Sequence, residues 1–229
     1  MKHETILLSI GGSLVVPDDI DRTFLKNLRS FASRHIRGGK RFAISVGGGS
    51  TCRVYQDAAR EVAPKTAQVE LDWIGIRTTE LNAYLVKVSM GHLAHHEVIS
   101  DPTRTLAIKK PVVVVAGWKP GCSTDMDAVL LARNFGIKRI ANLTNIDFVY
   151  DKDPRLNPDA KPLTDITWKA FRAILPAKWK PGLHSPFDPI ASRLAQKLDL
   201  TVAIVNGNNF SNLDKYISGT HFVGTVIHP

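Results

Sequence analysis

The sequence repeats one local pattern three times: an apolar run, a glycine-containing loop, and a segment with helical spacing. Strands that alternate with helices in this way form parallel sheets, because each helix returns the chain to the same edge of the sheet. The pattern therefore predicts an α/β fold with a mainly parallel sheet. The three apolar runs are Glu4–Ile10, Arg41–Val46 and Val112–Ala116. The loops that follow them are Gly11-Gly12-Ser13, Gly47-Gly48-Gly49 and Gly117 to Gly121.

Apolar spacing predicts further helices and strands in the rest of the chain. One helix ends near Arg37, with Asp18 or Asp19 as its N-cap. A long helix covers Val69–His92 and places Ile74, Leu81, Leu85 and Val88 on one face. We expect the Pro176–Pro186 segment to be irregular and the most mobile. The other expected elements are strands at Glu97–Ile99, Arg139–Leu143, Phe148–Tyr150, Thr201–Val205 and Phe222–Ile227, and helices at Trp168–Leu175 and Asp188–Leu198.

Length and composition narrow the class of protein. The 229 residues suffice for one large domain or two small ones, and we expect one domain, because no shift in composition marks a linker. No apolar run approaches the roughly 20 residues that span a bilayer. The N-terminal apolar run is too short for a signal peptide. Cys52 and Cys122 are the only cysteines, which favours a reduced, cytoplasmic protein.

The net charge of +9 fits partners that carry negative charge. The lysines and arginines are scattered, without a basic block, and this disfavours nucleic-acid binding. Three glycine loops at one edge of a sheet suit phosphate, because backbone amides approach an anion freely there and helix N-termini favour negative charge. Neither GxxxxGK[ST] nor GxGxxG occurs, so a P-loop and a dinucleotide fingerprint are both disfavoured.

Short motifs recur along almost the whole chain. In chain order they are Ile10–Ser13, Val46–Arg53, Asp72–Ile76, Gly117–Asp125, Thr144–Pro154, Asn157–Lys161, Asp188–Ala191 and Gly224–Ile227. With these motifs the sequence resembles the amino acid kinase superfamily and, within it, the archaeal-like uridylate (UMP) kinases. The resemblance implies a three-layer αβα sandwich, an acceptor-binding part at about 1–137 and an ATP-binding part at about 138–229.

The resemblance assigns roles to individual residues. It implies that ATP contacts Ser9, Ile10, Gly11, Gly12, Ser13, Gly49, Arg53, Thr144, Asn145, Tyr150 and Asp153. It implies that UMP contacts Gly48, Asp72, Trp118, Lys119, Pro120, Gly121, Cys122, Ser123 and Thr124. Arg53, Asp125, Lys119 and Asp188 are the candidate catalytic residues, and Mg²⁺ would be bound through the nucleotide phosphates.

Ser9 departs from the superfamily pattern, because many members have lysine at this position. Lys119 and Lys161 are the two candidates for the missing cation. Thr124 and Asp188 also have a purely structural interpretation as helix N-caps, and Thr124 with Asp127 resembles a capping box.

We expect transfer of the ATP γ-phosphoryl group to UMP, and a homo-oligomer, a hexamer built from dimers. The alternatives are a kinase for another small phosphate, such as isopentenyl phosphate, and a non-catalytic nucleotide- or anion-binding relative. We expect no metal site formed by side chains. His92, His95 and His96 suggest one, but a solvated helix end is the simpler interpretation.

Overall fold

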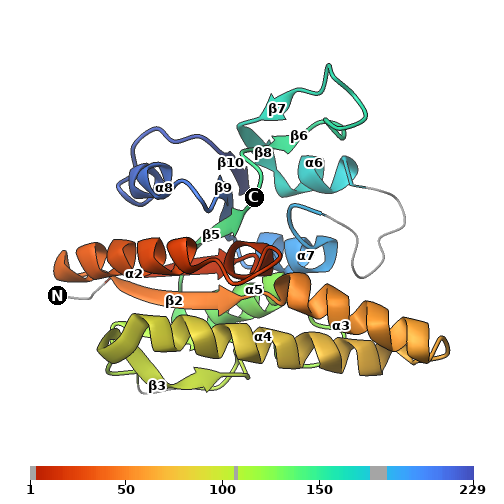
Figure 1. The fold of residues 1–229 in the computed structure, drawn as a ribbon. Coiled ribbons are helices and arrows are strands. Elements are labelled where there is room, and N and C mark those ends of the chain that lie inside the picture. The colour runs from red at the N-terminus through yellow and green to blue at the C-terminus, as the bar shows by residue number, and fades with distance from the viewer. Residues whose placement is uncertain (1–3, 106–107, 176–184) are drawn as a thin grey trace.

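A sheet of eight strands runs through the whole molecule, in the order β3-β4-β2-β1-β5-β9-β10-β8 (Figure 1). The computed structural model describes residues 4–105, 108–175 and 185–229. Neighbouring strands pair in parallel except β9 and β10, which are antiparallel. The α/β fold and the mainly parallel sheet predicted from the sequence are therefore confirmed.

Most strand bounds follow the apolar runs, but β3 begins three residues before the expected strand at Glu97–Ile99, β10 begins three residues after the expected start at Phe222, and β7 and β8 were not predicted. They are β1 (Thr5–Ile10), β2 (Arg41–Val46), β3 (Ala94–Ile99), β4 (Val112–Val115), β5 (Arg139–Thr144), β8 (Asp165–Thr167), β9 (Thr201–Asn206) and β10 (Thr225–His228). A separate hairpin consists of β6 (Val149–Tyr150) and β7 (Pro162–Leu163). The helices are α1 (Gly12–Val15), α2 (Arg22–Arg37), α3 (Gly49–Val62), α4 (Gln68–Met90), the short 3-10 turn η1 (Gly91–Leu93), α5 (Thr124–Phe135), α6 (Trp168–Ala173), α7 (Pro189–Lys197) and α8 (Phe210–Ile217).

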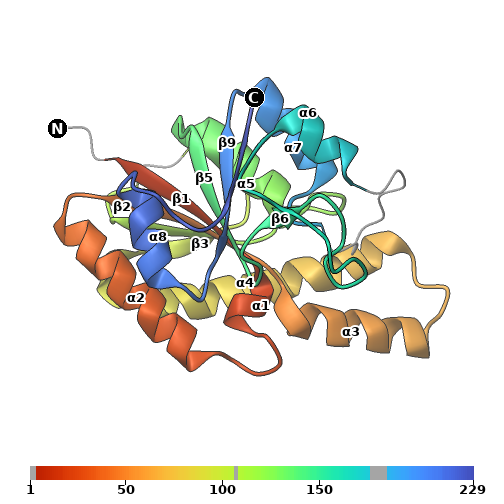
Figure 2. The ribbon, with the colours of Figure 1, turned by 90° about the horizontal axis from the view of Figure 1, so that it is seen from above.

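Helices cover both faces of the sheet, so the fold is the expected three-layer sandwich. Figure 2 shows α2, α4 and α8 on one side of the strands and α5, α6 and α7 on the other. Each side has its own apolar core, the first around Phe31 and Leu8 and the second around Trp168 and Leu7. Among the helices of the described residues, none combines the length and the apolar character needed to cross a bilayer.

Three expectations about local structure are wrong. The N-cap of α2 is Asp21, whose carboxylate accepts from the Phe24 amide at 2.8 Å, because the preceding residues form the loop after α1. The face of α4 that carries Leu81 and Val88 is not its buried face, since both side chains are more than half exposed. The apolar residues of α4 are spread around the whole circumference of the helix. Their spacing alone therefore does not show which side packs against the sheet.

The third error concerns the histidines. The helix ends at Met90, and His95 and His96 lie on strand β3. Most of the Pro176–Pro186 segment lies outside the described residues.

Two glycine loops touch through their backbones at the carboxyl end of β1 and β2. A Cβ atom on Gly12 would lie 2.0 Å from the Gly49 amide nitrogen and 2.6 Å from the Gly47 carbonyl. Gly49 also has φ of +68°, a conformation that favours glycine. This contact holds the start of α1 against the start of α3, so the two loops form one surface.

We predict that Gly12→Ala destabilises the fold by about 3 kcal/mol. The new Cβ would overlap backbone atoms of Gly47 and Gly49, which cannot move aside as a flexible side chain could. Urea denaturation followed by circular dichroism measures the change. Gly75→Ala, inside α4, is the matched control: its Cβ would make ordinary contacts with the Gln56 and Cys52 side chains of α3 at 3.4 and 3.5 Å, and alanine is favoured over glycine in a helix by about 1 kcal/mol. Equal stability of the two variants would contradict the prediction.

Candidate functional site

The three predicted glycine loops meet at one edge of the sheet. Strand β1 lies between β2 and β5, where the chain order of the strands reverses. The Gly11 amide donates to the Leu143 carbonyl of β5 at 2.9 Å, and the Gly47 amide donates to the Ile10 carbonyl at 2.9 Å. Ligands of open α/β sheets bind outside the carboxyl ends of the strands at such a reversal. The glycine loops therefore lie together where the sequence predicted them, and anion binding at this edge stays a prediction.

Helix α4 fixes these loops with buried polar side chains that the sequence analysis missed. The Asn82 amide donates to the Gly47 and Gly48 carbonyls, each at 3.0 Å. The Thr79 hydroxyl accepts from the Gly117 amide at 2.8 Å. Both side chains are almost wholly buried. Polar residues inside a long helix usually face solvent, and their spacing gave no signal that these two bond to loops distant in sequence.

Asp72 connects α4 to the third loop. One carboxylate oxygen accepts from the Gly121 amide at 2.9 Å, and the other accepts from the Gln68 side chain at 2.8 Å. Asp72 and the loop that contains Gly121, both predicted to contact UMP, thus lie together. Gln68 is a further residue at this point that the sequence analysis did not name.

The loop 117–123 carries the residues assigned to the acceptor. The Lys119 ammonium lies 3.8 Å from the centre of the Trp118 ring, which is a cation–π contact. The Cys122 amide donates to the Lys119 carbonyl at 3.1 Å, so the tip of the loop is a turn around Pro120 and Gly121. Burial raises the pKa of the Cys122 thiol, and this keeps it protonated at neutral pH.

The first turns of α5 and α7 meet at a cluster of Ser123, Asp125 and Asp188. The Ser123 hydroxyl donates to the Asp188 carboxylate and accepts from the Met126 amide. The Asp188 amide donates to the Asp125 carboxylate at 2.8 Å. The pKa of Asp125 is raised to about 7: burial raises it most, the bond from the Asp188 amide lowers it, and the Asp188 charge raises it by a smaller amount.

The capping roles differ partly from those considered from sequence. Ser123, and not Thr124, is the N-cap of α5, so the Thr124–Asp127 capping box is wrong. Asp188 does cap α7, since its carboxylate accepts from the first amides of that helix, and Pro189 follows at the first helical position. The structural interpretation of Asp188 is therefore confirmed, whereas its catalytic role stays a prediction.

Asp127 is buried one turn into α5. One carboxylate oxygen accepts from the Trp118 amide at 3.2 Å, and the other has no hydrogen-bond partner in the described part of the chain. Desolvation raises the pKa of this carboxyl to about 7. The group holds the start of the acceptor loop, but it does so at a cost in stability when it is charged.

A second group of residues assigned to ATP lies at the end of β5 and in the segment that follows it. The Thr144 hydroxyl accepts from the Ile146 amide at 3.1 Å, and Asn145 is exposed. Tyr150 is half-buried on β6. Asp153 pairs with the Arg155 guanidinium at 2.8 Å, which lowers the pKa of this carboxyl. These side chains lie between β5 and the hairpin β6–β7, which projects from the body of the molecule (Figure 1).

Arg53 and Ser9 occupy opposite sides of the glycine loops. The Arg53 guanidinium is exposed on the first turns of α3 and donates to the Ser13 hydroxyl at 3.4 Å. Ser9 is buried in β1, in register with Ser45 of β2 and Asn142 of β5. The three form a polar row across the sheet, so the position at which the superfamily pattern implied a lysine lies in the sheet, just before the first glycine loop.

A match to a protein-family model shows the family of this chain. Residues 4–206 match the model described as the amino acid kinase family. The chain belongs to the amino acid kinase family. Curated relatives include the uridylate kinase of Thermococcus onnurineus, 34% identical over 227 residues that cover 98% of this chain and 99% of the relative. The uridylate kinase of Sulfurisphaera tokodaii is 30% identical over 228 residues, with coverage of 98% and 99%.

Solved structures of the amino acid kinase fold resemble this chain as well. The crystal structure of uridylate kinase from Archaeoglobus fulgidus superposes with a TM-score of 0.80 at 29% identity and covers 97% of this chain and 99% of its own. The crystal structure of UMP kinase from Ureaplasma parvum superposes with a TM-score of 0.78 and covers 100% of both chains. At 19% identity, this similarity shows the fold alone.

We predict that Asp127→Asn makes the protein more stable at pH 8, by an amount that shrinks as the pH falls toward about 4. The folded pKa of about 7 lies above the ordinary value of 3.8, so the wild type loses stability as the pH rises from about 4 to about 7, where the buried carboxyl must ionise. The carboxamide removes this loss. Denaturation in urea at several pH values measures the slope.

Asp125 keeps part of the pH dependence, so the slope should shrink and not vanish. Asp57→Asn is the control, because this carboxylate is exposed and pairs with Arg60 at the surface. An unchanged slope in Asp127→Asn would contradict the assignment of the raised pKa.

Proposed function

We propose that this chain is a UMP kinase that transfers the γ-phosphoryl group of ATP to UMP and forms UDP for pyrimidine nucleotide synthesis. The observation that carries the proposal is the full-length similarity to uridylate kinases. The convergence of three glycine loops, two helix N-termini and Arg53 supports phosphoryl transfer chemically.

UMP would bind between α4 and the loop 117–123. Asp72 would bind the ribose, the amides of the loop would surround the nucleotide, and Thr124 at the start of α5 would contact its phosphate. Gly48 would complete this side of the site. The free first-turn amides of a helix and its dipole favour such a charge.

ATP would bind over the loop 9–13 and the segment 144–153. Thr144, Asn145, Tyr150 and Asp153 would surround the nucleoside, and Gly49 with Arg53 would contact the transferring phosphates. The acceptor half, about 1–137, contributes β1 to β4, and the donor half, about 138–229, contributes β5 to β10. The reacting phosphates would meet where the two halves share the sheet.

Phosphoryl transfer requires that the protein align the donor and the acceptor and supply positive charge, more than that it take part covalently. The acceptor oxygen of UMP is already anionic at neutral pH, so no general base is required. The Arg53 guanidinium and the loop amides would stabilise charge on the transferring group. Asp125 and Asp188 would lie near the reacting phosphates, where they would orient a cation or a hydrogen-bond donor that contacts them.

Mg²⁺ fits the donor set at this point, since Asp125 and Asp188 offer the hard oxygen ligands that it prefers. The raised pKa of Asp125 supports this fit, because a divalent cation would compensate the cost of its charge. When bound with ATP, the ion neutralises phosphate charge. Most of its ligands would come from the nucleotide.

Lys119 and Lys161 remain the candidates for the cation that Ser9 does not supply. Lys119 is exposed on the acceptor loop and rests on Trp118, from which its flexible chain could swing toward the phosphates. Lys161 lies at the base of the β6–β7 hairpin, where its amide donates to Asp151 at 2.8 Å. The position of Lys119 inside the acceptor loop favours Lys119.

A homo-oligomer and a cytoplasmic location complete the proposal. Helices α3 and α4 present exposed apolar side chains, and such a patch is typical of an interface. We propose that a second copy covers this face, as the first contact of a hexamer built from dimers. Its exposed apolar side chains include Val54, Tyr55, Val62, Val69, Trp73, Leu81, Tyr84 and Val88.

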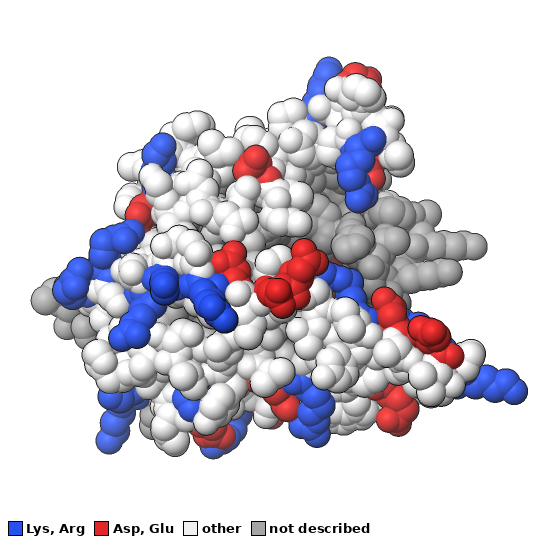
Figure 3. All heavy atoms as spheres, in the orientation of Figure 1, with Lys and Arg blue, Asp and Glu red and all other residues white. Residues whose placement is uncertain are grey.

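The charge distribution supports nucleotides as partners in preference to nucleic acid. On the face shown in Figure 3, basic and acidic side chains of the described residues are interspersed, and these residues form no continuous basic stripe there. A groove for nucleic acid requires such a stripe.

The decisive experiment supplies the purified protein with Mg-ATP and UMP, CMP, AMP or isopentenyl phosphate and follows ADP formation. Turnover with UMP above the other acceptors is expected. Turnover with another acceptor and none with UMP would replace the assignment. Tight nucleotide binding without turnover on any acceptor would favour a non-catalytic relative, for which the serine at position 9 is the best support.

We predict that Arg53→Ala lowers kcat by about 10²- to 10³-fold, the usual effect of removing one donor that stabilises transition-state charge. Steady-state assays with saturating ATP and UMP measure this. Arg60→Ala is the matched control, because Arg60 lies two turns further along α3 and pairs with Asp57 at the surface. A near-normal rate in Arg53→Ala would remove Arg53 from the phosphate site.

A further inference from the structure

Strand β3 departs from regular pairing where it carries His95, His96 and Glu97. The strand lies at the edge of the sheet and pairs only with β4. Ala94 is opposite Val112 and Val98 is opposite Val114, so four steps along β3 match two steps along β4. The two extra residues form a bulge, and the three residues between the paired positions are His95, His96 and Glu97.

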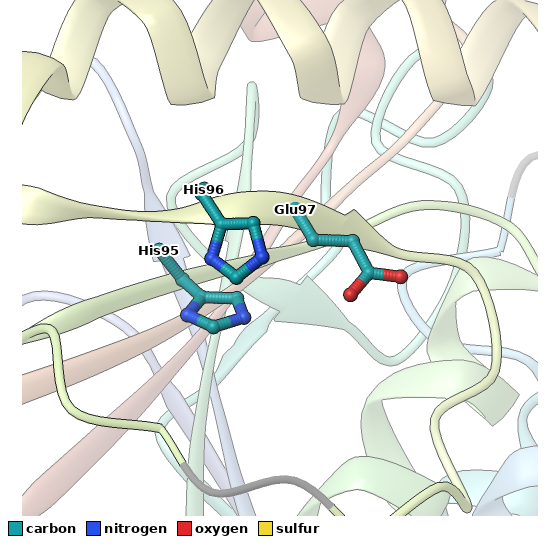
Figure 4. Close-up of side chains that lie close together, drawn as sticks. All are labelled: His95, His96 and Glu97. Atoms are coloured by element: carbon teal, nitrogen blue, oxygen red, sulfur yellow. The ribbon is translucent and has the colours of Figure 1, made fainter.

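The bulge brings side chains together that a regular strand would separate. Successive side chains of a strand point to opposite faces, and a bulge changes this alternation. Figure 4 shows the two imidazoles on the same side of β3, away from α4, with the Glu97 carboxylate next to them. The ring centres are 4.3 Å apart. One potential ligand atom from each of the three residues lies within 4.8 Å of the others.

We propose that His95, His96 and Glu97 bind one divalent transition-metal ion of the zinc class. Two imidazole nitrogens and one carboxylate oxygen form a donor set that suits Zn²⁺, Co²⁺, Ni²⁺ and Cu²⁺ better than Mg²⁺. Ligand atoms around tetrahedral zinc lie about 3.3 Å apart, as the bond lengths require. Small side-chain rotations close the present separation, and water fills the fourth position.

Arg104 is the residue that competes with the metal for the Glu97 carboxylate. Its guanidinium donates to the Glu97 carboxylate at 2.9 Å, and both side chains are substantially exposed. An exposed ion pair of this kind contributes little stability, so its loss opposes metal binding only weakly. The backbone beside it is held independently, because the Asn134 amide donates to the Pro102 and Arg104 carbonyls.

The site is separate from the proposed phosphoryl-transfer site. Strands β4 and β2 lie between β3 and β1 in the sheet, and none of the three residues contributes to the glycine loops. The inference therefore does not rest on the proposed function, and it departs from the sequence-based expectation that side chains form no metal site.

The test titrates the full-length protein, stripped with chelator and free of nucleotide, with Zn²⁺ at neutral pH in excess Mg²⁺. Calorimetry should give one tightly bound ion per chain. Co²⁺ in its place should give visible absorption bands of a low-coordinate ion. His95→Ala/His96→Ala should abolish both signals, whereas His92→Ala, an exposed histidine on the neighbouring turn, should leave them unchanged. If the double variant misfolds by circular dichroism, the exposed single variant His96→Ala must show the loss.

Arg104→Gln separates this site from adventitious binding to surface histidines. Removal of the Arg104 guanidinium frees Glu97 and should tighten Zn²⁺ binding by up to about fivefold. This factor corresponds to the free energy that an exposed ion pair contributes at room temperature. The proposal is overturned by no saturable binding to the wild type, by binding that survives in the histidine variants, by loss of binding in His92→Ala, or by an affinity that Arg104→Gln weakens.

Discussion

Direct backbone contact between Gly12 and the Gly47–Gly49 loop is the constraint on which the rest of the site depends. Two strands of a parallel sheet end side by side, and their loops must turn away from the same edge. Only glycine allows them to do so in contact, because any Cβ at Gly12 would occupy the place of backbone atoms. The close approach sets the start of α3 next to α1, and Arg53 consequently reaches Ser13.

Helix α4 organises the acceptor side in a comparable way, through side chains and not through close approach. Asn82, Thr79 and Asp72 lie along one helix and bind three loop segments in turn. Each bond satisfies loop backbone that would otherwise be left without a partner at a site partly closed to water. The loops are therefore positioned by a rigid element, as a site that depends on alignment requires.

The sequence predicts the sheet well and the buried polar contacts poorly, for physical reasons. Apolar runs and glycine loops are local signals, and strands β1, β2 and β4 lie where those signals place them. The role of Asn82 depends on which face of α4 packs, and this is decided by tertiary contacts. Likewise, Asp21 caps α2 and Ser123 caps α5 because of how the preceding loops close. The bulge of β3 leaves no pattern in the sequence, so His95 and His96 could not be paired from spacing.

The hydrogen bonds of Asp72 give one side chain two tasks under the proposed function. Each of its carboxylate oxygens accepts one bond, from the Gly121 amide and from the Gln68 side chain. A carboxylate has lone pairs for about four bonds, so a ribose hydroxyl would add to these bonds without replacing them. The group that anchors the loop would then also contact the ligand, and the position of the loop and the position of the ribose would be set by the same carboxylate.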